Sequence, residues 1–163
     1  MYIDKINQMI NANNIKDALN LIELTGTEKD YNTTHYLLEL LVTTDNHLVR
    51  NQVAIALSDL RCQEAVKPIV NLLKSPNTLG YRGTLLYALE PLDYTDQIGL
   101  LLDFIITGNF EVSRTAFLLL EQVKDKISSE LKQEYRMKME TLIEELEDKI
   151  DFINEAIDGF TNI

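Results

Sequence analysis

Cysteine, histidine and tryptophan are almost missing from this chain of 163 residues, which has one, two and none of them. The single cysteine, Cys62, excludes an internal disulfide and a cysteine-rich zinc module. The two histidines, His35 and His47, make no close ligand pair such as Cys-x-x-Cys or His-x-x-x-His. We expect both histidines on the surface and Cys62 as a passive turn residue. The sequence therefore predicts no metal site and no other cofactor.

Glycine and proline are also scarce, at six and three residues, and they lie where helices are expected to begin or end. No apolar run approaches the roughly 18 residues of a membrane span, and the first residues lack the apolar core of a signal peptide. A glycine-rich phosphate loop and a Gly-x-Ser-x-Gly motif are both missing from the sequence. We therefore expect one all-α domain over residues 1–163, without a membrane segment and located in the cytoplasm.

The chain does contain an internal repeat. The apolar run Leu37–Leu41 returns 32 positions later as Ile69–Leu73, and 32 positions later again as Leu101–Ile105. Between these runs a second pattern recurs, in which Val49-Arg50 corresponds to Tyr81-Arg82. A period of this size is typical of stacked helical hairpins, which present extended surfaces and commonly bind macromolecules.

Apolar spacing and turn residues together predict the helices of each unit. The repeats occupy residues 32–124, between N-terminal helices in residues 1–31 and a long acidic helix over 128–158. Asn14 is expected to cap the second N-terminal helix, and Gly26 to end it. The N-terminal helices are predicted at 3–12 and 14–24, the helices that we call B near 32–43, 63–74 and 96–107, and those that we call A near 47–60, 80–92 and 111–124.

The best-formed unit reads VRNQVAIALSDL over residues 49–60 and EAVKPIVNLL over residues 64–73. It resembles a HEAT-like repeat of the short bacterial form that is also seen in bilin-lyase-type proteins. The resemblance covers roughly residues 32–124 and implies a right-handed α-α superhelix of helical hairpins. It also implies that the recurrent Arg50 and Arg82 pair with acids of neighbouring turns. The chain departs from the pattern at Gly80 and Gly83, and at Ser113, which replaces the repeated arginine.

The C-terminal segment has a different character, because residues 129–158 contain no glycine or proline. Apolar residues alternate there in steps of four and three, which is a heptad seam. Two interpretations stay open: the seam packs on the last repeat, or it pairs with another chain. For the fold we predict the first, a long C-terminal capping helix. The seam residues are Met139, Ile143, Leu146, Ile150, Ile153, Ile157 and Phe160.

The formal net charge is −11, and residues 121–163 contribute the largest part of it with 12 acidic and 6 basic side chains. A surface this acidic repels nucleic acid and anionic lipid and attracts basic proteins. The simpler alternative is that the acidity only keeps the protein in solution.

Positions on one side of the B helices form a ladder, because residues three, seven and ten apart share a helix face. Acids at both ends of this B face flank two lysines in its middle. The predicted partner-binding residues on the B face are Glu39, Glu64, Lys67, Asn71, Lys74, Asp96 and Asp103, joined by Tyr81 and by Glu144, Glu147, Asp148 and Asp151 of the last helix. Tyr87 and Tyr94 are further aromatic candidates, since tyrosine is common in interface hot spots. An ordinary hydrated face is the competing interpretation.

These observations predict a non-enzymatic protein-binding module. Its most concrete form is an inhibitor that blocks a cationic toxin such as a nuclease, similar in kind to the small acidic immunity proteins of bacteria. We expect a basic protein partner, such as a toxin domain, and neither nucleic acid nor membrane as a partner. We also expect a monomer or weak dimer. A general HEAT-repeat scaffold and, less favoured, a bilin-lyase-like enzyme are the alternatives.

Overall fold

The computed structural model describes residues 2–161, and within them it contains nine α-helices, five short 3-10 turns and no strand. The all-α prediction is confirmed. The helices are α1 (Tyr2–Asn11), α2 (Ile15–Thr27), α3 (Thr34–Thr43), α4 (His47–Asp59), α5 (Val66–Lys74), α6 (Arg82–Tyr87), α7 (Ile98–Thr107), α8 (Phe110–Gln122) and α9 (Ser129–Thr161). None of the helices within residues 2–161 is long and apolar enough to cross a bilayer.

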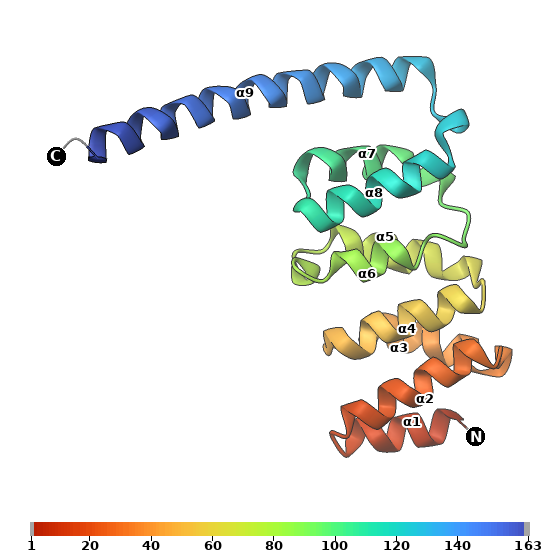
Figure 1. Cartoon of the computed structure of the whole chain (residues 1–163). Helices are drawn as coiled ribbons and strands as arrows, with labels where there is room; N and C mark the ends of the chain where they lie inside the picture. Colours follow the sequence, from red (N-terminus) through yellow and green to blue (C-terminus); the bar gives the residue numbers. More distant parts are fainter. Residues whose placement is uncertain (1, 162–163) are drawn as a thin grey trace.

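The first eight helices form four antiparallel pairs that follow one another along one direction (Figure 1). One layer contains α2, α4, α6 and α8, each in contact with the next. The other layer contains α1 and the B helices α3, α5 and α7. The start of each B helix shows the repeat most directly, because 3-10 turns begin at Tyr31, Gln63 and Thr95, which are 32 residues apart. The α-helices that follow begin at the same spacing.

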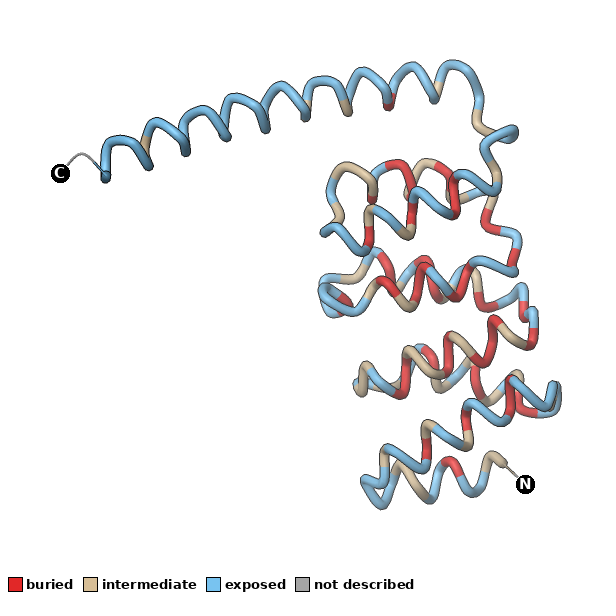
Figure 2. The backbone as a smooth tube through the Cα atoms, in the orientation of Figure 1, coloured by how far each residue is buried: buried red, intermediate tan, exposed pale blue. Residues whose placement is uncertain are grey.

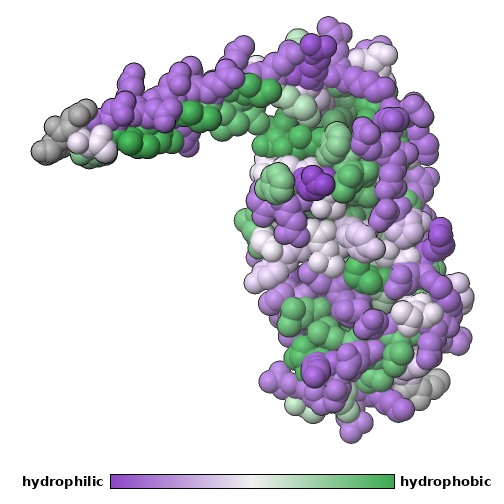
Figure 3. Space-filling model, viewed as in Figure 1, coloured by the Kyte–Doolittle hydropathy of each residue, from purple (hydrophilic) through white to green (hydrophobic). Residues whose placement is uncertain are grey.

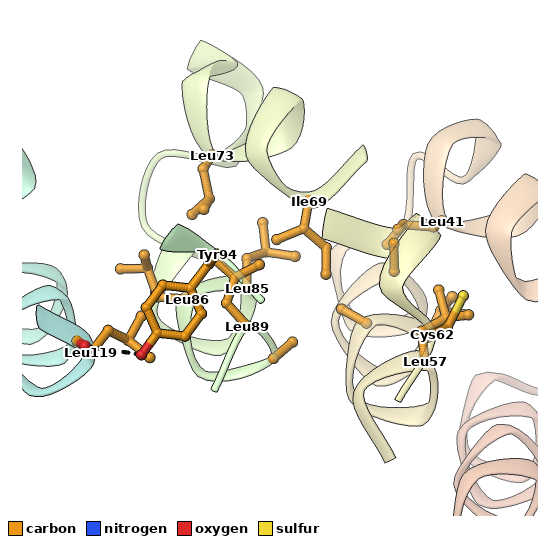
Figure 4. Close-up of a cluster of buried hydrophobic side chains, with 14 of the residues drawn as sticks. Leu41, Leu57, Cys62, Ile69, Leu73, Leu85, Leu86, Leu89, Tyr94 and Leu119 are labelled. Atoms are coloured by element: carbon orange, nitrogen blue, oxygen red, sulfur yellow. Dashed lines mark hydrogen bonds between the residues drawn. The ribbon is translucent and has the colours of Figure 1, made fainter. Parts of the chain in front are cut away.

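The repeated apolar runs supply the core between the two layers (Figure 2). Leu41, Ile69 and Leu73 of the B helices meet side chains of α4 and α6 such as Leu57 and Leu85 (Figure 4). All five are fully buried. Burial of a large apolar side chain stabilises the fold by about 1.5–3 kcal/mol relative to its exposure, so this periodic pattern fixes which face of each helix turns inward.

Asparagine side chains cap three of the helices. Asn14 accepts a hydrogen bond from the amide of Asp17, and Asn46 and Asn109 cap α4 and α8 in the same way. The prediction for Asn14 is confirmed, whereas the prediction that Gly26 ends α2 is wrong. The helix continues to Thr27 because Gly26 is buried against α4, where an added Cβ would lie 2.9 Å from the Ala56 Cα. Gly26 therefore permits a close helix approach rather than a stop.

Helix α6 is much shorter than the predicted span of 80–92. Gly80 has a φ of +85°, a conformation that favours glycine and keeps the chain out of the helix until Arg82. Beyond Tyr87 the chain continues in tight turns up to Pro91, which cannot supply a helical backbone donor. The two glycines noted in the sequence thus fall in the unit that departs furthest from the repeat.

The long helix α9 leaves the stacked pairs and extends away from them as a single arm (Figure 1). Only its first turns pack on the body, through Tyr135, which is buried, and through the partly buried Leu131 and Met139. From Ile143 onward the seam residues are exposed. The predicted capping helix is therefore wrong for most of its length, because α9 runs past the edge of α7 and reaches no further surface.

Candidate protein-binding face

A groove opens on the B face between α5 and the turn that precedes α7. It has a volume of about 650 Å³. Five residues that the sequence predicted for partner binding line it: Glu64, Lys67, Asn71, Lys74 and Asp96. The helical spacing argument placed these side chains on one face, and the stacking of two units brings them around one depression.

Two further grooves continue this surface toward the N-terminal end of the stack. Val42 of α3 and Lys67 and Asn71 of α5 line one of about 490 Å³, which is largely apolar. Glu39 lines the other, of about 320 Å³, together with Asn7 of α1 and Tyr36 of α3. The Tyr36 hydroxyl donates a hydrogen bond of 2.9 Å to Asn7 Oδ1 and so joins the two helices at that groove. The B face is thus a run of grooves between successive units, which we call the groove face.

The far wall of the 650 Å³ groove contains Gln63 and Asp93, two turn residues that the sequence argument missed, and Tyr94, which it had named as an aromatic candidate. Gln63 Nε2 donates to the Asp93 carbonyl at 2.7 Å, and the Asp93 amide donates back to Gln63 Oε1 at 2.9 Å. The Tyr94 hydroxyl donates to the Leu119 carbonyl at 2.9 Å, which fixes the same turn to α8 (Figure 4). The one available signal was the position of Gln63 and Asp93 in successive A-to-B turns, 30 residues apart.

Two carboxylates at this groove are held in their ionised form. The Glu64 backbone amide and the Cys62 thiol, with Sγ 3.4 Å from Glu64 Oε2, lower the pKa of Glu64. The Thr95 hydroxyl, at 2.7 Å, and the Thr95 amide lower the pKa of Asp93. With Asp96 on the same rim and Lys67 and Lys74 along α5, the groove offers charge of both signs to a ligand.

Asp103, the last acid of the predicted ladder, already has a partner within the chain. Its Oδ1 accepts a hydrogen bond of 2.5 Å from the Tyr135 hydroxyl. The Asp103 carboxylate accepting this hydrogen bond, together with burial, raises the pKa of Tyr135 to about 12. Asp103 therefore fastens α9 to α7, which is a structural role that its helical position did not reveal.

The three tyrosines lie in separate environments. Tyr81 stacks on His47 with ring centroids 4.0 Å apart, and neither residue lines the grooves of the B face. Tyr87 is exposed beside a depression on the other layer, and Tyr94 is buried. Glu144, Glu147, Asp148 and Asp151 are all exposed on the part of α9 beyond its contact with the body. Most of the predicted site residues thus lie on the groove face or on the acidic arm, whereas Tyr81 lines none of these grooves and Asp103 is bonded to Tyr135.

The two histidines and the single cysteine each have a different neighbour, namely Glu39 for His35, Tyr81 for His47 and Glu64 for Cys62. His35 lies 3.3 Å from Glu39 on the exposed side of α3. Cys62 is buried, not merely a turn residue, and its burial raises the pKa of the thiol. Within residues 2–161 no group of three or more His, Cys, Asp or Glu side chains has the arrangement of a metal site.

The recurrent arginines have structural roles, but the expected ion pair with a neighbouring acid is wrong. Arg82 donates from Nη2 to the Ser75 carbonyl at 3.0 Å, and its guanidinium lies 5.5 Å from the centre of the Phe104 ring. Arg50 is buried at 6% exposure, and its Nε has no hydrogen-bond partner. In one unit the repeated arginine, Arg82, thus holds the B-to-A turn. In the other unit the Nε of Arg50 is buried without a hydrogen bond.

Comparison of the chain with protein-family models, curated proteins and solved structures gives no match.

Proposed function

We propose that this protein is a non-enzymatic protein-binding module that grips its partner with the groove face. The observation that carries the proposal is that Glu64, Lys67, Asn71, Lys74 and Asp96 line one groove, which continues into two more. A peptide segment or loop of a partner fits such a row of open depressions better than a small molecule does, since small-molecule sites enclose most of their ligand. A right-handed superhelical winding of the stacked pairs stays part of this proposal.

The most concrete form of the proposal is an inhibitor of a cationic toxin, such as a nuclease. A protein that binds phosphates displays lysine and arginine, and a chain with a net charge of −11 is attracted to that surface. The carboxylates of Glu64 and Asp93, whose pKa values are lowered, and the side chain of Asp96 beside them can then accept hydrogen bonds from the basic side chains of the partner. Charge-assisted pairs of this kind are the stronger class of hydrogen bond.

Two variants with the same change of net charge test the location. Glu64→Gln with Asp96→Asn removes two acids from the groove, and Glu144→Gln with Glu147→Gln removes two from the arm. Each tagged variant is used to isolate partners from cells that produce the protein, and affinity for the identified partner is then measured by calorimetry at several salt concentrations. The groove variant should lose about 10-fold or more in affinity and the arm variant less than about 3-fold, because only contact acids lose direct hydrogen bonds.

If the two variants lost the same amount of affinity for the partner, the contact would not lie at the groove. A bound partner that keeps its full activity would refute the inhibitor while leaving a scaffold role. Retention of a small molecule by the purified protein, with conversion of that molecule, would favour the enzyme alternative.

A further inference from the structure

The exposed face of α9 carries a row of uncovered apolar side chains. Figure 3 shows it as a hydrophobic stripe along one edge of the arm, with hydrophilic side chains on the opposite edge. Its residues are 45–79% exposed: Ile143, Leu146, Ile150, Ile153, Ile157 and Phe160. Contiguous apolar patches of this kind mark interaction sites on soluble proteins.

We propose that a second copy of this chain covers the stripe, and that the two α9 helices pair antiparallel over residues 143–160. The proposal goes beyond the binding function of the groove face and does not depend on it. Six seam residues from each copy would bury on the order of 1,000 Å² in total, which reaches the lower limit for a specific interface.

The body of the protein decides the direction of the pair. Tyr135 and Met139, which pack on the body, lie on the same face of α9 as the exposed seam, because the seam continues from Met139 in steps of four and three. In a parallel pair the first turns of the second α9 would have to occupy the space that α7 fills. An antiparallel pair instead places Phe160 of the second copy opposite Ile143, the first seam residue beyond the body, and so avoids the clash.

The antiparallel register also separates the acids. It pairs Ile143 with Phe160, Leu146 with Ile157 and Ile150 with Ile153. On the flanks of the seam this register sets Glu147 beside Asn154 and Lys149 beside Ala156, so that no two carboxylates oppose each other across the interface. The remaining acids of this segment lie away from the seam: Glu144, Glu145, Asp148, Asp151, Glu155 and Asp158.

The part of α9 that extends from the body also lacks the packing that stabilises most helices. Helices in water depend mainly on packing of an apolar face, and acids four residues apart destabilise a helix. Within residues 2–161, Met139 is the last hydrophobic residue of α9 that packs against the buried core. The arm carries Glu144 and Asp148 at that spacing, and Glu147 and Asp151 as well. Pairing with a second copy would supply the missing packing without changing the groove face.

The test measures the molar mass by sedimentation and light scattering at rising protein concentration. The wild type should reach twice 18.7 kDa. Association should strengthen from about 50 mM to about 500 mM salt, since salt screens the repulsion between two acidic copies. Ile150→Glu with Ile153→Glu should weaken association at least 100-fold, because the interface would bury unpaired carboxylates. Phe152→Glu, a single apolar-to-acid change on the outer face of the same helix, should leave association at about 500 mM salt unchanged.

Disulfide trapping tests the direction. A mixture of Leu146→Cys and Ile157→Cys proteins should form a crosslinked heterodimer on oxidation, whereas Leu146→Cys alone should not crosslink, since bridged Cα atoms lie within about 7 Å. Efficient crosslinking of Leu146→Cys to itself would refute the antiparallel arrangement. A wild type that stays monomeric at high concentration and salt would overturn the proposal, and so would a monomer that binds a lysine-rich amphipathic peptide on this seam. Neither result would affect binding at the groove face.

Discussion

Replacement of Tyr135 by phenylalanine isolates the contact that holds the arm to the body. The change keeps the buried ring and removes the hydroxyl that donates to Asp103 at 2.5 Å and to the Gly99 carbonyl at 3.4 Å. A hydrogen bond to a charged group contributes about 1.5–3 kcal/mol. Asp103 is exposed and regains water when the hydroxyl is lost. We therefore expect the lower end of that range, about 1.5 kcal/mol.

The pH dependence gives this prediction a second, independent check. The pKa of Tyr135 is raised to about 12 in the folded protein, above the ordinary value of about 10 for the unfolded chain. A raised pKa means that the folded state holds the proton more tightly, so this stabilisation is complete below pH 10. The stabilisation is lost as the pH rises from about 10 to about 12. The difference between wild type and Tyr135→Phe should therefore be constant from pH 6 to 9 and shrink above pH 10.

Hydrogen exchange of the amides in the first turns of α9 is the direct assay, with urea unfolding as a global measure. Exchange there should be about 10-fold faster in Tyr135→Phe at pH 7, since about 1.4 kcal/mol corresponds to a factor of ten. Tyr87→Phe, the same chemical change at an exposed ring, serves as the control. Unchanged protection at pH 7, or a difference that grows above pH 10, would refute the role of the hydrogen bond.

Three further predictions concern the body of the protein. Gly83→Ala should raise the free energy of unfolding by up to about 1 kcal/mol through helix propensity, because only the flexible Glu111 side chain must move. Gly26→Ala should instead lower the free energy of unfolding by about 1–3 kcal/mol, because the backbone of α4 cannot move. Urea titrations that ranked the two variants in the opposite order would contradict this prediction. Arg50→Met should be neutral or stabilising by about 1 kcal/mol in thermal unfolding, since a buried guanidinium nitrogen without a partner is removed; a loss above about 2 kcal/mol would reveal a missed partner. Cys62, which is buried and has a raised thiol pKa, should react with a thiol reagent at pH 8 far more slowly than in urea, and equal rates would contradict the packing.

The sequence period was sufficient to predict the stacked part of the fold. Three B helices begin at Thr34, Val66 and Ile98, at the predicted spacing, because each unit buries the same positions against its neighbours. Local exceptions were less predictable. A glycine reads as a helix stop in sequence, yet Gly26 lies within α2, because its lack of a side chain serves the contact with α4 and not a turn.

The candidate groove was predictable on one side only. Helical spacing placed Glu64, Lys67 and Asn71 on a common face, and all three line the largest groove. The opposite wall comes from the turn around Asp93, whose position depends on the hydrogen bonds of Gln63 across 30 residues. Periodicity says which residues share a helix face, but it does not say how deep the space between two units is.

The heptad seam of α9 shows the same limit. Its spacing predicted a face that needs a cover, and this face is indeed apolar and continuous. Whether the body itself covers this face depends on how far the body extends along α9. The contact of α9 with the buried core extends only to Met139. The apolar pattern of one helix does not show how far a neighbouring surface extends along it. The capping interpretation was therefore wrong beyond the first turns of α9.

The separation of the two acidic regions has a kinetic consequence for the proposed binding function. The arm carries the densest charge, while the groove combines acids with Lys67 and Lys74. Long-range attraction sets the rate of encounter, whereas short contacts set the rate of dissociation. Neutralising Glu144 and Glu147 should therefore slow association with a basic partner at low salt, by a factor that disappears at high salt. Removing Glu64 and Asp96 should instead speed dissociation at every salt concentration, because those carboxylates would be in direct contact with the partner.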